Sequence, residues 1–408
     1  MDNPRLGLEL VGLGIERKLF AREGFTTSYV RVAEHIYRAL LFLAPEEWEL
    51  QLFASNRWHH KEGEEGSFRK HLGQVHTLFR PPSLPLIDRW VTQPWREWLR
   101  RRHYIPRARS EKLSVMQFTS EWPWGSSPIA EREIALAADF FPERISASSA
   151  RDTAERFKKR RESTWVIAIS EFTRQDAVSV VQIPAGRVKA LPLAVDHGIY
   201  RPDEQEADSE TRRRLAMPEN YVLYVGSLSE RKNVITLVRA MEAFNSRRSS
   251  SEPVTLILAG NVAAANFRQR HQVWSQIRAL LKQTPIRQVA YPTDAEMAAL
   301  YRGAQVVAHP SVFEGFGFTV LEALACGTPV ICGRHSSLVE VGGPAARFVE
   351  DVRNVEEFAA ALDEVIGSSA LRQSMRSRGI AHAAGFRWDI FEKQVVEFYG
   401  RVLSGRDL

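Results

Sequence analysis

Short apolar runs alternate with helically spaced apolar residues in the first half of the chain. The runs have the length of buried strands and lie at residues 6–11, 48–53, 114–118, 134–138, 165–169 and 188–193. Between the first two runs, apolar side chains from Tyr29 to Leu43 recur at helical spacing, which predicts a helix. The last run leads into a polar, acidic stretch, residues 203–211, which is typical of a linker between domains.

The second half of the chain alternates more regularly. Predicted strands lie at 221–225, 254–259, 288–291, 306–308 and 330–332, and predicted helices at 234–244, 274–281, 295–301 and 319–325. Strands that alternate with helices are joined by right-handed crossovers into a parallel sheet with helices on both faces. We therefore expect an α/β fold of two doubly wound, Rossmann-like domains. Ligands of such sheets bind at the carboxyl ends of the strands.

The composition is that of a folded globular protein. Of the 408 residues, 44% are hydrophobic and 25% are charged, which excludes a disordered, collagen-like or coiled-coil chain. No apolar run reaches the ~18 residues that span a bilayer, and no apolar segment of a secretion signal follows Met1. Cys326 and Cys332 are too few for a disulfide framework. We expect a cytoplasmic protein.

Positive charge is concentrated in one segment of the first half. The net charge is +6, and most of the excess falls between Arg96 and Arg109, where Glu97 is the only acidic residue. Apolar and Trp side chains recur at helical spacing over residues 87–99. This pattern is typical of an amphipathic helix on an anionic membrane surface, or of a core-facing helix with a solvated basic side. We expect no nucleic acid partner, because no nucleic-acid-binding module is present.

A glycine-rich turn follows the predicted strand at 306–308. Gly315 and Gly317 allow close backbone approach, and the helix that begins near Thr319 offers unpaired N–H groups to an anion. Glu314 and Glu322 bracket this turn, and carboxylates accept hydrogen bonds from sugar hydroxyls. The arrangement suits a ligand with phosphates and sugars. In the alternative interpretation, Glu314 caps the helix and Glu322 is solvated.

A second turn carries two cations. Arg231 and Lys232 lie between the predicted strand at 221–225 and the next helix, where their side chains can reach a diphosphate or can simply be solvated. The chain contains no Asp-x-Asp sequence for a divalent metal, and His59-His60 is interpreted as surface. We therefore expect no metal and no other cofactor, with charge neutralised by these cations and a helix N-terminus.

Residues 221–366 resemble the C-terminal domain of the retaining glycosyltransferases of family 4, which have the GT-B fold of two facing Rossmann-like domains. The matching segments are 223–226, 231–233, 258–260, 294–301, 309–311, the Glu-x7-Glu pair of Glu314 and Glu322, 323–330 and 336–341. The pair alone is a weak signal, but the surrounding run makes the resemblance specific. It covers the second half of the chain most densely.

The resemblance implies a role for each motif. Glu314 would hold the hydroxyls of the donor sugar, Glu322 the nucleotide ribose, Arg231 and Lys232 the diphosphate, and the segment around Tyr291 would face the base. The remaining donor-binding positions implied are Gly226, Ser227, Gly315, Phe316, Gly317, Phe318, Thr319 and Val320.

The first half resembles the family more loosely. Gly24, Phe25 and Thr26 precede a helix where the family has a loop close to the donor phosphate and the acceptor. Residues 386–408 resemble the C-terminal helix that crosses back to the N-terminal domain. The expected organisation is an acceptor-binding domain at 1–203, a nucleotide-sugar-binding domain at 204–385 and this helix.

One position departs from the family pattern. Many members carry a His-Asp pair at the end of an N-domain strand, and Asp139 matches the Asp as a catalytic candidate, but Ala138 stands in place of the His. Either the enzyme lacks this contact to the donor sugar or the matching segment lies elsewhere, for example at 117–121. Asp139 could equally be a structural cap.

The resemblance implies retaining transfer of a mannose-like or related hexose or deoxyhexose from a nucleotide diphosphate sugar, with GDP or UDP as carrier. The acceptor would be a hydroxyl of a glycan or polyprenol-linked glycan in surface polysaccharide synthesis, such as that of lipopolysaccharide. The enzyme would be cytoplasmic, with the segment from Arg96 to Arg109 as a contact to the inner membrane face. Alternatives are a sugar-phosphate-using phosphorylase or synthase of the same fold, and a basic nucleic-acid- or membrane-binding protein.

Overall fold

The computed structural model of the chain divides into two compact units. The first unit combines the described residues up to Pro192 with Asp389–Leu408, and the second extends over Leu193–Trp388. The residues that the structure describes are 5–9, 31–32, 35–36, 38–40, 49–54, 74–77, 114–117, 130–140, 146–158, 163–248, 253–260, 267–282, 284–405 and 408.

The described part of the first unit contains a seven-stranded sheet with the order β3-β2-β1-β4-β5-β6-β7. Its strands are β1 (Arg5–Glu9), β2 (Glu49–Ala54), β3 (Gln74–Thr77), β4 (Val115–Gln117), β5 (Arg132–Ala137), β6 (Thr164–Ala168) and β7 (Val188–Ala190). Each neighbouring pair is parallel. The expected parallel sheet is therefore confirmed in this unit.

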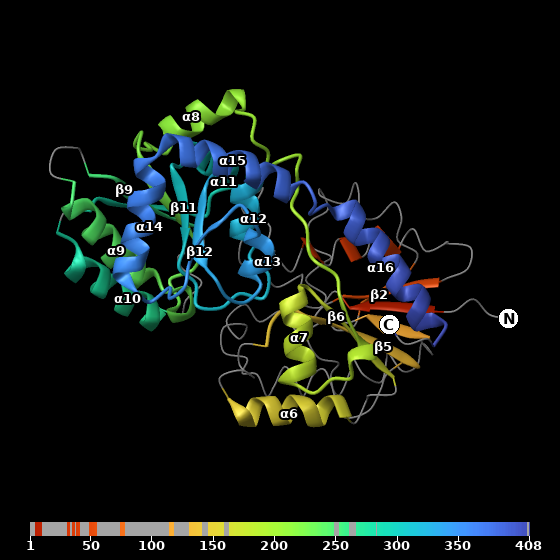
Figure 1. Cartoon of the computed structure of the whole chain (residues 1–408). Helices are drawn as coiled ribbons and strands as arrows, with labels where there is room; N and C mark the ends of the chain where they lie inside the picture. The colour runs from red at the N-terminus through yellow and green to blue at the C-terminus, as the bar shows by residue number, and fades with distance from the viewer. Residues whose placement is uncertain are drawn as a thin grey trace, which may run out of the picture. The chain divides into compact units, whose positions relative to one another are not determined.

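Helices cover this sheet and include one from the end of the chain. Those with bounds in the described residues are α6 (Ala147–Lys158), α7 (Glu171–Ser179), the 3-10 turn η5 (Ala185–Arg187) and α16 (Trp388–Leu403). Buried Val166 of β6 and Ala177 of α7 belong to one apolar cluster. The Tyr399 hydroxyl of α16 donates to Gln117 Oε1 of β4 at 2.7 Å, so the last helix packs on the first unit (Figure 1).

The described part of the second unit holds a six-stranded parallel sheet with the order β10-β9-β8-β11-β12-β13. Its strands are β8 (Tyr221–Val225), β9 (Thr255–Gly260), β10 (Ile286–Ala290), β11 (Val306–His309), β12 (Val330–Gly333) and β13 (Arg347–Val349). Counted from β8, this is the Rossmann order 3-2-1-4-5-6. The strand order reverses between β8 and β11, which is the switch point where ligands of such sheets bind.

Helices lie on both faces of the second sheet. They are α8 (Glu206–Arg214), the 3-10 turn η6 (Glu230–Lys232), α9 (Val234–Ser246), α10 (Phe267–Leu280), α11 (Asp294–Gly303), α12 (Phe318–Ala325), α13 (Leu338–Gly342), α14 (Val355–Gly367) and α15 (Ser369–Ala383). Figure 1 shows α9, α10 and α14 on one side of the strands and α11, α12 and α13 on the other. Val238 of α9 and Leu362 of α14 belong to one buried apolar cluster with Val222 and Leu256 of the sheet. Burial of these fully enclosed side chains stabilises the unit by roughly 1.5–3 kcal/mol each.

The acidic stretch at 203–211 is not a linker, contrary to the expectation from composition. It forms the start of α8, where Gln205 and Asp208 make a reciprocal capping box. Asp208 also accepts two hydrogen bonds from Arg302, at 2.5 and 2.7 Å. Acidic residues stabilise the first turn of a helix, so the composition that indicated a linker is that of a helix start.

The division between the units falls after Pro192, whereas the expected domain boundary lies after Asp203. The Val195 amide donates to Phe386 O at 3.3 Å, so the segment after Pro192 packs with the second unit.

None of the helices in the described residues is long and apolar enough to cross a bilayer.

Candidate functional site

The candidate site is built from the two loops that follow β8 and β11, which are neighbouring strands. The Val312 amide donates to Arg231 O at 2.9 Å, and Arg231 Nη1 donates to Phe313 O at 2.9 Å. The loops therefore hold each other at the carboxyl ends of the two central strands. This is the position at which an open α/β sheet binds its ligand.

The turn η6 presents Arg231 and Lys232 as expected, and Asn233 fixes its geometry. Asn233 adopts a left-handed conformation, with φ of 52°. Its side-chain amide donates to Pro310 O and Val352 O, at 3.2 and 2.8 Å. A short polar side chain tolerates this conformation, so Asn233 orders the turn that carries both cations.

Glu314 lies at the centre of a cluster of charged side chains, the Glu314 cluster, which also contains Lys232, Arg231 and His309. Lys232 Nζ is 2.5 Å from Glu314 Oε1, His309 Nε2 is 3.0 Å from the same oxygen, and Arg231 Nη1 is 3.5 Å from Oε2. Burial opposes ionisation of Glu314, but Lys232, His309 and Arg231 hold its pKa well below the usual range. The carboxylate is therefore ionised near neutral pH.

His309 is a neutral hydrogen-bond donor in this cluster. Burial lowers the pKa of His309, although Glu314 acts in the opposite direction. Because an ionised carboxylate only accepts, the proton of the neutral ring lies on Nε2. Nδ1 of His309 is buried without a hydrogen-bond partner in the described part of the chain. His309 lies in segment 309–311 of the family resemblance, which implied no role for it.

Two serines after β12 hold the loop that carries Glu314. The Glu314 amide donates to Ser336 Oγ at 3.3 Å, and Ser337 Oγ donates to Glu314 O and Phe316 O at 2.8 and 2.7 Å. Ser336 has a φ of 52°, a strained conformation for a serine. These contacts could not be predicted from the sequence, because the local pattern does not indicate which loop a serine after a strand will contact.

Gly317 sets the start of α12. Its φ is 111°, which favours glycine, and a Cβ there would lie 3.0 Å from Leu338 Cδ2. The helix begins at Phe318, next to the expected Thr319, and no side chain caps it. An uncapped N-terminus offers backbone N–H groups to an anion.

Glu322 faces a buried tyrosine of the neighbouring helix. The Tyr301 hydroxyl of α11 donates to Glu322 Oε2 of α12 at 3.0 Å. Glu322 is 7% exposed and Tyr301 is fully buried. Burial, together with the Glu322 charge, raises the pKa of Tyr301 well above its usual value, so the phenol remains protonated. The solvated alternative for Glu322 is wrong.

The remaining donor-site candidates of the second unit lie at the carboxyl edge of its sheet. Gly226 and Ser227 follow β8, and the Ser227 carbonyl accepts from the Tyr224 hydroxyl at 2.6 Å. Tyr291 follows β10, and its amide donates to Gly260 O at 3.2 Å. Gly315, Phe316, Thr319 and Val320 lie in the glycine turn and first turn of α12. What these residues bind stays a prediction.

The candidates in the first half are only partly described. Asp139 follows β5 in the first unit, and the preceding Ala138 carbonyl accepts from Thr173 Oγ1 at 3.4 Å. Gln117, from the alternative segment at 117–121, donates to Ile134 O at 3.3 Å and accepts from Tyr399, so its amide is used in packing. The acceptor-loop residues Gly24, Phe25 and Thr26, the pair His59-His60 and the segment from Arg96 to Arg109 lie outside the described residues.

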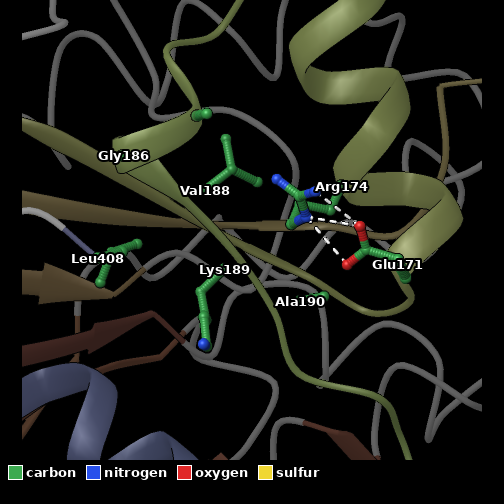
Figure 2. A pocket seen from close by; sticks show the side chains of 8 residues that line it. Glu171, Arg174, Gly186, Val188, Lys189, Ala190 and Leu408 are labelled. Atoms are coloured by element: carbon green, nitrogen blue, oxygen red, sulfur yellow. Dashed lines mark hydrogen bonds and ion pairs between the residues drawn. The ribbon is translucent and has the colours of Figure 1, made fainter.

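A separate pocket of about 400 Å³ lies in the first unit (Figure 2). Arg174 donates to both carboxylate oxygens of Glu171, at 2.8 and 2.9 Å, and this pair lowers the pKa of Glu171. Lys189 and Leu408 also line the pocket.

Where side chains are described, no group of three His, Cys, Asp or Glu residues could hold a metal ion.

Residues 206–382 match the family model described as "Glycosyl transferases group 1". The second unit carries a glycosyl transferases group 1 domain. Among curated proteins, O-antigen chain mannosyltransferase B of Escherichia coli is 28% identical over 236 residues, 57% of this chain and 60% of that protein. A D-inositol 3-phosphate glycosyltransferase of Salinispora arenicola is 27% identical over 250 residues, 60% of this chain and 56% of that protein. The chain thus spans less than two thirds of either relative.

A solved structure extends the likeness beyond the glycosyl transferases group 1 domain. HepE of Anabaena, in complex with UDP and glucose, has a TM-score of 0.72 at 18% identity, covering 98% of this chain and 100% of that chain. At this identity the likeness shows the fold, which is the parallel α/β fold of GT-B glycosyltransferases. The expected fold class is confirmed.

Proposed function

We propose that this chain is a retaining glycosyltransferase that takes a mannose-like or related sugar from a nucleotide diphosphate sugar. The observation that carries the proposal is the Glu314 cluster, with its two cations and buried carboxylate at the carboxyl ends of β8 and β11. An uncapped helix N-terminus follows the same loop. A diphosphate requires cations and backbone N–H groups as hydrogen-bond donors, and the sugar joined to it requires an acceptor for its hydroxyls, here the carboxylate.

The diphosphate would take the place of Glu314 as the partner of Arg231 and Lys232. Without a donor, the single Glu314 carboxylate pairs with both cations and leaves one positive charge uncompensated between them. A bound diphosphate brings its own negative charge to them, which releases the carboxylate to accept hydrogen bonds from sugar hydroxyls. Glu322 would in turn accept from the ribose.

In the proposed reaction, the bond between the anomeric carbon and the diphosphate oxygen breaks while a bond to the acceptor oxygen forms on the same face. The acceptor hydroxyl gives its proton to the departing diphosphate. Arg231, Lys232 and the α12 N-terminus stabilise the negative charge that develops on the leaving group. No protein nucleophile is required, and the anomeric configuration is retained.

The proposed acceptor is a hydroxyl of a glycan or polyprenol-linked glycan in surface polysaccharide synthesis. A similar protein is an O-antigen chain mannosyltransferase, which supports a glycan acceptor and a mannose-like donor. The basic segment from Arg96 to Arg109 would draw the enzyme to an anionic membrane surface, at about 1 kcal/mol per Arg near the surface. The proposed location is cytoplasmic, on the inner membrane face.

The test is donor turnover with purified full chain. GDP-mannose, UDP-glucose and UDP-N-acetylglucosamine are each incubated without metal, with a polyprenol-linked oligosaccharide as acceptor, and proton NMR reports the anomer formed. We expect turnover of one donor with retained configuration, abolished by Lys232→Ala but not by Lys282→Ala, an exposed lysine of the same unit. An inverted product, or unchanged turnover in Lys232→Ala, would contradict the proposal.

A further inference from the structure

Tyr301 and Glu322 form a buried pair that joins α11 to α12. The hydroxyl donates to Oε2 at 3.0 Å, and both residues are withdrawn from solvent. A carboxylate oxygen has two acceptor positions, and the group as a whole has about four. The hydrogen bond from Tyr301 therefore does not by itself prevent Glu322 from accepting one from a sugar hydroxyl.

Tyr301 itself has little freedom to move. Its carbonyl accepts from Thr328 Oγ1 at 2.7 Å and from the Ala304 amide at 3.0 Å. Its ring meets the ring of Tyr200 edge to face, with centroids 6.1 Å apart. Since a close-packed interior leaves the ring in one rotamer, the position of the hydroxyl is fixed.

We propose that Tyr301 is a positioning residue that aims the Glu322 carboxylate at the ribose 2′- and 3′-hydroxyls of the donor nucleotide. It thereby sets a preference for ribonucleotides over 2′-deoxyribonucleotides. This inference rests on the proposed function, because it needs a nucleotide at the carboxyl edge of the second sheet. Without the phenol, the carboxylate side chain gains torsional freedom and the ribose loses an oriented acceptor.

The alternative is that Tyr301 only ties two helices together. Tyr221 supplies the matched control, because it is equally buried and its hydroxyl donates to Leu300 O, on the same helix, at 2.6 Å. Removing either hydroxyl costs one buried hydrogen bond to α11 or α12. Of these two hydroxyls, that of Tyr301 donates to Glu322 and that of Tyr221 donates to a backbone carbonyl. A purely structural role for Tyr301 therefore predicts the same nucleotide preference in both variants.

The experiment is calorimetric titration of the full chain with UDP and GDP and with their 2′-deoxy counterparts. We expect the wild type to prefer the ribonucleotide about ten-fold, the typical effect of one hydrogen bond to a charged group. Tyr301→Phe should reduce the preference to about two-fold, while Tyr221→Phe should keep it. In a Glu322→Gln background, which removes the buried charge, Tyr301→Phe should change the preference no further.

Two results would overturn the inference and leave the proposed function standing. If Tyr301→Phe keeps the wild-type preference while Glu322→Gln loses it, Glu322 holds the ribose without help and Tyr301 is structural. If Tyr301→Phe and Tyr221→Phe lose the preference equally, the effect is a general loss of packing. A wild type that binds neither nucleotide would overturn the proposed function itself, and the inference with it.

Discussion

The residue that organises the candidate site is Glu314, which pairs with both cations assigned to the diphosphate. The sequence predicted Glu314, Arg231 and Lys232, because each sits at a strand end with a recognisable local pattern. It did not predict the contacts of His309, Ser336 and Tyr301. These side chains reach the site from other strands or helices, and no local pattern carries that information.

Glu314→Gln should separate phosphate binding from transfer. The neutral amide no longer competes with the diphosphate for Lys232 and Arg231. The affinity for UDP or GDP should therefore rise by about three- to ten-fold, which corresponds to roughly 1 kcal/mol of binding free energy. Transfer should fall, since the sugar hydroxyls lose a charged acceptor. Calorimetry and turnover measure the two effects, with the exposed Glu219→Gln as a control for net charge. Weaker nucleotide binding in Glu314→Gln would contradict this account of the cluster.

The Glu314 pKa also predicts a pH dependence of stability. Its pKa lies well below 4.5 in the folded chain, so the folded state binds fewer protons than the unfolded state in acid. The stabilisation is fully present above about pH 4.5 and is lost as pH falls through the folded pKa. Urea unfolding at pH 7 and pH 4 should show a larger loss for wild type than for Glu314→Gln. Equal losses would contradict the assignment.

At the level of elements, α8 shows where composition misled. Residues 203–211 are acidic and polar, but the acidic side chains form a capping box and a buried ion pair with Arg302. A linker and the polar start of a helix have the same composition. Here the helix is stabilised by Arg302, a partner distant in the sequence that the composition of 203–211 does not reveal. By contrast, the predicted strand at 221–225 coincides with β8. A strand buried on both faces is a continuous apolar run, so it can be recognised from the sequence without knowledge of its partners.

Asp208→Asn should destabilise the second unit strongly. The Asp208 and Arg302 side chains are 4% and 5% exposed, and removing one charge leaves the other buried and unpaired. Such a loss typically costs about 3–5 kcal/mol in the free energy of unfolding. Urea unfolding measures the free energy of unfolding of Asp208→Asn and of the control Glu210→Gln. The control removes an exposed ion pair with Arg213 that stabilises the fold by about 0.5 kcal/mol or less. A cost below about 1 kcal/mol would show that α8 is not held by this pair.

At the level of the whole molecule, the sequence predicted two parallel sheets, but it did not predict every strand in them. Alternating strands and helices require right-handed crossovers, which give parallel sheets. The strands β3 and β13 were missed, since each has few residues and little apolar pattern. The resemblance predicted that the last helix returns to the first half, and α16 does belong to the first unit, where Tyr399 donates to Gln117.

We infer that the carboxyl edge of the second sheet binds a nucleotide diphosphate through Arg231, Lys232 and Glu322. The most direct measurement is a thermal-shift panel of UDP, GDP, ADP, CMP and dTDP, with a chelator present, on wild type and Glu322→Ala. A ligand at 100 times its dissociation constant adds about 2.7 kcal/mol to the folded state. We predict that one nucleotide raises the melting temperature of wild type and not of Glu322→Ala. No shift with any nucleotide, or an equal shift in both proteins, would contradict the account.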